Sequence, residues 1–146
     1  MGKKEEIAAA AASVLQPGET VDATAMAVVG RWNVGKSAAL AAVTAIASLG
    51  MLSVMTVPKQ QPLVLTSKRF LILGVKQDGV VERPEGKIAA EIPRSELRAL
   101  PARRVMLYHA VDVTDVTGNK LTRMKFGLFD GAAAKQFAEG LGAGLI

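Results

Sequence analysis

The chain has 146 residues, a net charge of +5 and an isoelectric point of about 9.7, and its length predicts one domain with one hydrophobic core. The absence of cysteine and the single histidine exclude disulfides, thiolate metal sites and histidine metal clusters, and we expect no metal and no other cofactor. The 18 basic residues are spread along the chain, a pattern that argues against sequence-specific recognition of nucleic acid.

Residues 1–16 predict a short N-terminal helix. Lys3-Lys4 is followed by Glu5-Glu6, and the apolar stretch from Ile7 to Leu15 is nine residues long, which is short for a secretion signal. Pro17-Gly18 then ends the helix. We predict a cytoplasmic location, and we extend this prediction to peripheral attachment at the cytoplasmic face of the membrane.

Residues 20–29 predict a strand, and the segment after it matches the phosphate-loop pattern at every fixed position, with Gly30, Gly35, Lys36 and Ser37. The sequence of this segment resembles the first motif of the ribosome-assembly class of P-loop GTPases. In such a loop the backbone from Gly30 to Lys36 cradles phosphates, Lys36 reaches the β- and γ-oxygens, and Ser37 binds Mg²⁺.

The residues after this motif favour a different interpretation. A phosphate loop belongs to a parallel sheet, whose crossovers each need a dozen or more residues, usually as a helix. Between Pro58 and Asp130 the sequence predicts strands joined by turns and no such helix. We therefore interpret the match as accidental, and nucleotide binding stays as an alternative.

An apolar, alanine-rich insertion, residues 36–58, separates this first strand from the second. From Ser37 to Pro58 it holds 22 residues without a charge, long enough to span a bilayer. If both flanking strands belong to one small domain, however, both ends of the insertion lie on the same side of the membrane. Three conformations of the insertion remain open: a helical hairpin, a surface helix, or a helix buried against a second subunit. The contact residues that we predict for membrane or oligomer are Trp32, Leu40, Val43, Ile46, Leu49 and Leu52.

The second half predicts short strands at about 62–66, 69–75, 87–92 and 98–103. Lys76 to Gly86 is predicted as a polar loop, and Arg94 to Leu100 as at most one helical turn. A long strand is predicted from Val105 to Thr114, with Leu107, His109 and Val111 on one face.

A hairpin partner and a final helix complete the predicted elements. Residues 121–128 alternate, with Met124 and Phe126 facing one way and Arg123 and Lys125 the other, as in a strand with one solvated face. The helix at 131–142 has Asp130 as its predicted N-cap and an apolar stripe with Phe137 in the core.

Three segments together resemble the bacterial pleckstrin-homology-like (PH-like) domains: residues 15–19 (LQPGE), 63–73 (LVLTSKRFLIL) and 91–97 (EIPRSEL). The resemblance covers residues 13–142 except for the insertion, and residues 17–146 form the expected domain. It implies a mainly β (α+β) fold: a bent antiparallel seven-strand barrel capped by a C-terminal helix, with the helical apolar insertion between strands 1 and 2. It also implies a generally non-enzymatic protein, and no ligand residue carries over.

The resulting functional prediction is a non-catalytic binding or scaffold module that acts at a membrane surface or through self-association by the insertion. Its expected partner is a membrane surface or a protein, as a homo-oligomer, without nucleic acid and without an identified small-molecule substrate. The alternatives are a self-assembling structural or adaptor protein without lipid binding, and a P-loop nucleotide-binding protein. His109, Asp112 and Asp115 are interpreted as sheet and turn residues, not as catalytic groups or metal ligands.

Overall fold

The computed structural model describes residues 3–30, 60–78 and 81–142. Two helices enclose a series of strands in the chain order α1 (Lys3–Ala12), β1 (Val21–Val29), β2 (Gln60–Thr66), β3 (Arg69–Asp78), β4 (Val81–Pro93), a 3-10 turn η3 (Arg94–Glu96), β5 (Leu97–Ala99), β6 (Arg103–Val105), β7 (Tyr108–Asp115), β8 (Lys120–Gly127) and α4 (Gly131–Gly140). The fold is thus mainly β with an N-terminal and a C-terminal helix, as predicted.

The strands form one antiparallel sheet in the order β4-β3-β2-β1-β8-β7-β5, with β6 paired to β7. The first and last strands of this order, β4 and β5, do not pair with each other, so the sheet is open. β1 joins the two halves: it pairs along its length with β2 but meets β8 only through Val28↔Lys125 and Val29↔Met124. The described sheet has eight strands, where the sequence predicted seven.

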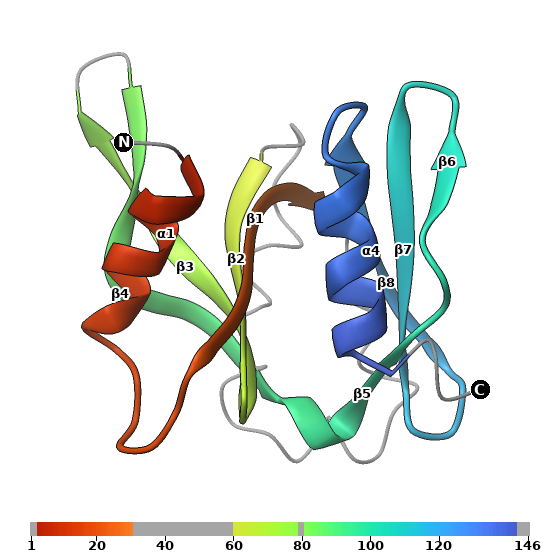
Figure 1. The fold of residues 1–146 in the computed structure, drawn as a ribbon, viewed down its shortest axis with the longest axis horizontal. Helices are drawn as coiled ribbons and strands as arrows, with labels where there is room; N and C mark the ends of the chain where they lie inside the picture. The colour runs from red at the N-terminus through yellow and green to blue at the C-terminus, as the bar shows by residue number, and fades with distance from the viewer. Residues whose placement is uncertain (1–2, 31–59, 79–80, 143–146) are drawn as a thin grey trace.

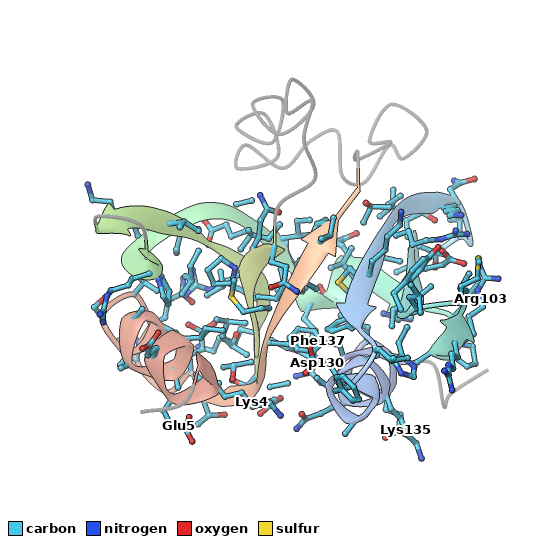
Figure 2. All side chains as sticks on the ribbon, turned by 90° about the horizontal axis from the view of Figure 1, so that it is seen from above. Lys4, Glu5, Arg103, Asp130, Lys135 and Phe137 are labelled. Atoms are coloured by element: carbon cyan, nitrogen blue, oxygen red, sulfur yellow. The ribbon has the colours of Figure 1, made fainter. Side chains whose placement is uncertain are left out.

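The main core lies between the sheet and α4. Phe137 of α4 is fully buried, with its ring 6.3 Å from that of Phe70 and 5.7 Å from that of Phe126, measured between centroids. Figure 2 shows Phe137 on the sheet side of α4 and Lys135 on the outer side. The predicted apolar stripe of this helix is confirmed, since Ala133, Ala134, Phe137 and Ala138 are its buried residues.

The N-terminal helix packs on the other face of β2 and β3. Ile7 and Ala11 of α1 form a second apolar cluster with Val64, Leu71 and Leu73. The neighbouring residues Leu63, Leu65, Phe70 and Ile72 belong to the main core instead. Because side chains alternate along a strand, β2 and β3 are covered on both faces, and Figure 1 shows β1 and β2 running between the two helices.

A buried ion pair ties the start of the chain to the sheet. Arg69, at the start of β3, donates from Nε and Nη2 to the two carboxylate oxygens of Glu19 at 2.9 and 2.6 Å. Its Nη2 also donates to the carbonyl of Val14, just after α1, at 3.0 Å, and its Nη1 pairs with Glu91 of β4. One guanidinium therefore links the segment between α1 and β1 to β3 and β4.

Within the described residues, two of the sequence predictions are wrong and a third is wrong in part, because the predicted strand at 98–103 is interrupted: β5 ends at Ala99 and β6 begins at Arg103. The predicted loop from Lys76 to Gly86 is largely strand, because β3 continues to Asp78 and β4 begins at Val81. The predicted strand from Val105 to Thr114 is broken by a turn at Met106 and Leu107, which separates β6 from β7. In both places a tight hairpin, closed by the pairs Asp78↔Val81 and Val105↔Tyr108, replaces the predicted loop or continuous strand.

Candidate functional site

Most of the residues predicted as sites lie outside the described residues. These are Trp32, Gly35, Lys36, Ser37, Leu40, Val43, Ile46, Leu49 and Leu52. Gly30 is described: its N–H donates to the carbonyl of Arg123, and its own carbonyl accepts a hydrogen bond from the Thr122 hydroxyl, both at 2.9 Å. Gly30 thus extends the pairing of β1 with β8. Every strand pair between described residues is antiparallel, whereas a phosphate loop belongs to a parallel sheet.

The isolated polar residues of the second half have structural partners. The Nε2 of His109 lies 3.0 Å from the carbonyl oxygen of Leu128. Asp115 is buried and accepts hydrogen bonds from Thr117 and Asn119, which close the turn between β7 and β8. Among the described residues, no group of three or more potential ligands is placed to hold a metal ion.

The outer face of β6, β7 and β8 gathers positive charge. Asp112 of β7 is directly opposite Arg123, and Ala110 lies between Lys125 on β8 and Arg103 on β6. The intervening residues Val111 and Met124 belong to the main core. Alternation therefore directs the charged side chains to the face away from α4.

One carboxylate organises this face. Arg123 donates from Nε to Oδ1 of Asp112 at 2.7 Å, Lys120 Nζ lies 3.5 Å from the same oxygen, and Arg103 Nη2 lies 3.3 Å from Oδ2. Burial by itself would raise the pKa of the Asp112 carboxyl, but the hydrogen bond from Arg123 and the three positive charges outweigh it and hold the pKa below its usual value. Asp112 therefore stays ionised and fixes three cations that would otherwise repel one another.

A fourth cation extends the patch toward one end of the sheet. The Nζ of Lys125 lies 5.2 Å from the centroid of the Tyr108 ring, a cation–π contact. We call Arg103, Lys120, Arg123 and Lys125, together with Asp112, the cationic face. Four positive charges against one negative leave a surface that attracts anions, and Figure 2 shows Arg103 at the edge of the molecule farthest from α1.

Next to this face, the sheet ends in exposed apolar side chains. Met106 and Leu107 form the two-residue turn between β6 and β7 and are 84% and 75% exposed, and Phe129, after β8, is 96% exposed. Pairing of Tyr108 with Val105 and with Gly127 brings both segments to the same end, the end at which α4 begins in Figure 1. We call Met106, Leu107 and Phe129 the apolar tip.

The backbone of the tip is strained. Met106 has φ = 51°, in the left-handed region, and no other described non-glycine residue has a positive φ. Turns of two residues between strands that need a positive φ normally carry Gly, Asn or Asp, and a residue with a Cβ costs about 1–2 kcal/mol there. A large apolar side chain thus occupies a position where glycine would be less strained.

Replacing Met106 by glycine is therefore expected to raise the free energy of unfolding by about 0.5–1 kcal/mol, the relief of strain less the entropy that glycine adds to the unfolded chain. Urea unfolding measures it. Leu107→Gly is the matched control, since the φ of Leu107 is not positive, and we expect that variant to be less stable than the wild type. A Met106→Gly variant that lost as much stability as Leu107→Gly would contradict this account of the turn.

Two hollows of moderate size flank α4. One, of about 330 Å³, lies between α4 and the segment before β6 and is lined by His109, Lys135 and Glu139 among others. The other, of about 300 Å³, lies between α1, β1 and the start of α4. Among their described lining residues, no hydrogen bond joins a nucleophile to a base, so we assign no chemistry to either.

Comparison with known proteins adds no assignment. Neither a scan against protein-family models nor a search of curated proteins gives a match. Among the described residues, no helix has the length and apolar character required to cross a bilayer.

Sequence reasoning missed the cationic face, although part of its signal was visible. The alternation of residues 121–128 correctly separates Arg123 and Lys125 from the core residues Met124 and Phe126. Arg103 and Lys120 lie far from one another in the chain, and only the register of β6, β7 and β8 brings them to one carboxylate.

Proposed function

We propose that this chain is a non-catalytic binding module of the PH-like type that acts at an anionic membrane surface. The observation that carries the proposal is the cationic face: a solvent-accessible sheet surface with four cations and a single carboxylate. Such a surface matches the charge of a leaflet that contains anionic lipids, where each well-placed Lys or Arg contributes about 1 kcal/mol to binding.

The PH-like assignment is supported by the order of the elements. A sheet of consecutive antiparallel strands, β1 to β4, is followed by a second run of short strands and then by a helix that covers the core. The resemblance of residues 15–19, 63–73 and 91–97 falls on the segment that holds Glu19, on β2 and β3, and on the passage from β4 to β5. On this proposal α4 is the capping helix, and residues 36–58 lie in the chain between the first two strands, β1 and β2.

We propose that the protein has no catalytic role because its candidate polar groups are already used in structural contacts. In the described residues, Asp112 is neutralised by cations, Asp115 is used in a turn, and His109 has a backbone partner. The two alternatives, self-assembly through residues 36–58 and nucleotide binding by Gly30 to Ser37, depend mainly on residues outside those described and stay predictions.

Cosedimentation with vesicles tests the proposal. We expect the double variant Lys120→Gln/Lys125→Gln to bind vesicles of phosphatidylcholine with 30% phosphatidylserine about 30-fold more weakly than the wild type, since two cations contribute about 2 kcal/mol. The control Lys87→Gln/Lys135→Gln removes the same charge from exposed positions on β4 and α4, and we expect it to bind within about threefold of the wild type.

Two results would contradict the cationic face as the binding surface. One is an equal loss in both double variants, which would indicate that only net charge matters. The other is unchanged binding in Lys120→Gln/Lys125→Gln together with complete loss on deleting residues 38–57, which would assign the membrane contact to the insertion instead.

A further inference from the structure

The apolar tip stands out among the exposed side chains of the described residues. Exposed large apolar side chains are normal when scattered singly. Here the three most exposed ones, Met106, Leu107 and Phe129, lie at one end of the sheet, while Val75, Leu100 and Val116 are each half-exposed or less. Two of the three occupy adjacent positions in a tight turn, so they project together.

The strained turn keeps an apolar side chain at its outermost position. Met106 adopts a left-handed φ that glycine would adopt without cost. The Met106 side chain is 84% exposed, so it gains little from packing against the rest of the described chain. Because strained residues held in place by a fold are commonest where they serve a function, the side chain of Met106 is expected to have its contact outside the domain.

The surroundings of the tip indicate what that contact is. Arg103 and Arg104 precede the turn, with Val105 between them and Met106, and Tyr108, with Lys125 against its ring, immediately follows it. Apolar side chains followed by a tyrosine and then by cations match the layers of an anionic bilayer: acyl chains, interface and charged headgroups. A protein groove would match the apolar part, whereas the charges complement an anionic lipid surface.

The dimensions also fit. A two-residue turn at the end of a strand pair extends about 5–7 Å beyond Tyr108, at about 3.3 Å per residue. Apolar groups of proteins that bind the membrane surface are buried about 5–10 Å into the boundary between headgroups and acyl chains.

We propose that the apolar tip, Met106, Leu107 and Phe129, inserts into the acyl boundary of an anionic bilayer while the cations of the cationic face nearest the tip, Arg103 and Lys125, lie among the headgroups. This inference rests on the proposed function and assigns its insertion site. The tip orients the sheet with the start of α4 toward the membrane.

The absence of cysteine allows a direct test on the full chain. Leu107→Cys and, as control, Val116→Cys in the turn at the opposite end of β7 each receive one environment-sensitive NBD label. With vesicles of 30% phosphatidylserine we expect a blue shift at position 107, and quenching of its fluorescence by spin-labelled acyl chains. At position 116 we expect neither.

A second set of variants measures the contribution of the side chains. We expect Phe129→Ser and Met106→Gly each to weaken binding to the same vesicles about tenfold or more, because each removes a large apolar group from lipid. Met106→Gly is the sharper of the two, since it is expected to fold at least as stably as the wild type. Val116→Ser is the matched control and should bind as the wild type does.

Three other results would each contradict membrane insertion of the apolar tip, and they can be told apart. Charge-dependent binding with no shift at position 107 and no effect of the tip variants would exclude insertion and leave the proposed function standing. A blue shift that appears without vesicles as protein concentration rises would assign the tip to a contact between two copies of the chain. No binding to anionic vesicles at all would remove both proposals.

Discussion

Replacing Arg69 by methionine is expected to lower the free energy of unfolding by about 3–5 kcal/mol, the cost of leaving a buried charge without its partner. Glu19 is 6% exposed, and its carboxylate receives two hydrogen bonds from the Arg69 guanidinium and one from the Thr66 hydroxyl. Without Arg69, Glu19 is either buried as an unpaired anion or must take up a proton. Urea unfolding measures the loss.

The same network gives this prediction a pH dependence. The hydrogen bond from Arg69, against the opposing effect of burial, lowers the pKa of Glu19 from its ordinary value of 4.5 to about 2. A lowered folded-state pKa stabilises the fold fully above pH 4.5, and the stabilisation is lost as the pH falls from 4.5 toward 2. For a shift of this size the loss is about 3 kcal/mol, and in Arg69→Met we expect most of it to be absent.

Two further variants separate the ion pair from a general effect of mutation. Arg98→Met, at an exposed arginine of β5, is expected to change stability by about 0.5 kcal/mol or less. The double variant Arg69→Met/Glu19→Leu is expected to recover part of the loss, since it removes the unpaired charge as well. A double variant as unstable as Arg69→Met alone would contradict the role given to Glu19.

Replacing Phe137 by alanine is expected to cost about 3–5 kcal/mol, through lost burial and the cavity that remains. Its ring is fully buried, between the rings of Phe70 on β3 and Phe126 on β8. These strands lie on opposite sides of the pair β2 and β1 in the sheet order, so a single side chain of α4 connects the two halves of the sheet.

Phe129→Ala is the matched control, because Phe129 is two residues before α4 and is 96% exposed. Its loss of stability should stay within about 0.5 kcal/mol. Thermal or urea unfolding compares the two variants. Equal losses at the two positions would be inconsistent with Phe137 as the anchor of α4.

The parts of the fold that follow from local periodicity were predictable. The spacing of Ala133, Ala134, Phe137 and Ala138 is that of a helix with one buried stripe, and α4 buries these residues. The alternation around Met124 and Phe126 placed both in the core. Such patterns depend only on the repeat of the element that carries them.

The turn at Met106 and Leu107 was not predictable in the same way. The run from Val105 to Thr114 is rich in strand-forming residues and has no Gly, Asn or Pro, so Leu107 was predicted on one face of a continuous strand with His109 and Val111. The structure instead holds Met106 in a left-handed conformation and leaves Leu107 exposed. The residues that break the local rule are the ones to which we assign membrane insertion.

The candidate site was hidden for a second reason. Arg103, Lys120 and Arg123 form a group only because β6 and β8 both pair with β7 around Asp112. That register is set by where the turns between β6 and β7 and between β7 and β8 fall, which composition and spacing do not encode. Arg69 and Glu19 are 50 residues apart, separated by all of β1, the insertion and β2, so local pattern could not pair them.

The dependence of vesicle binding on anionic lipid and on salt tests the central claim most directly. With the full chain in 0.1 M salt, we predict no binding to pure phosphatidylcholine, clear binding at 30% phosphatidylserine, and a marked loss of that binding at 1 M salt, where the screening length falls from about 10 to about 3 Å. Binding that is equal on neutral vesicles, or unchanged at 1 M salt, would contradict a membrane contact made by the cationic face.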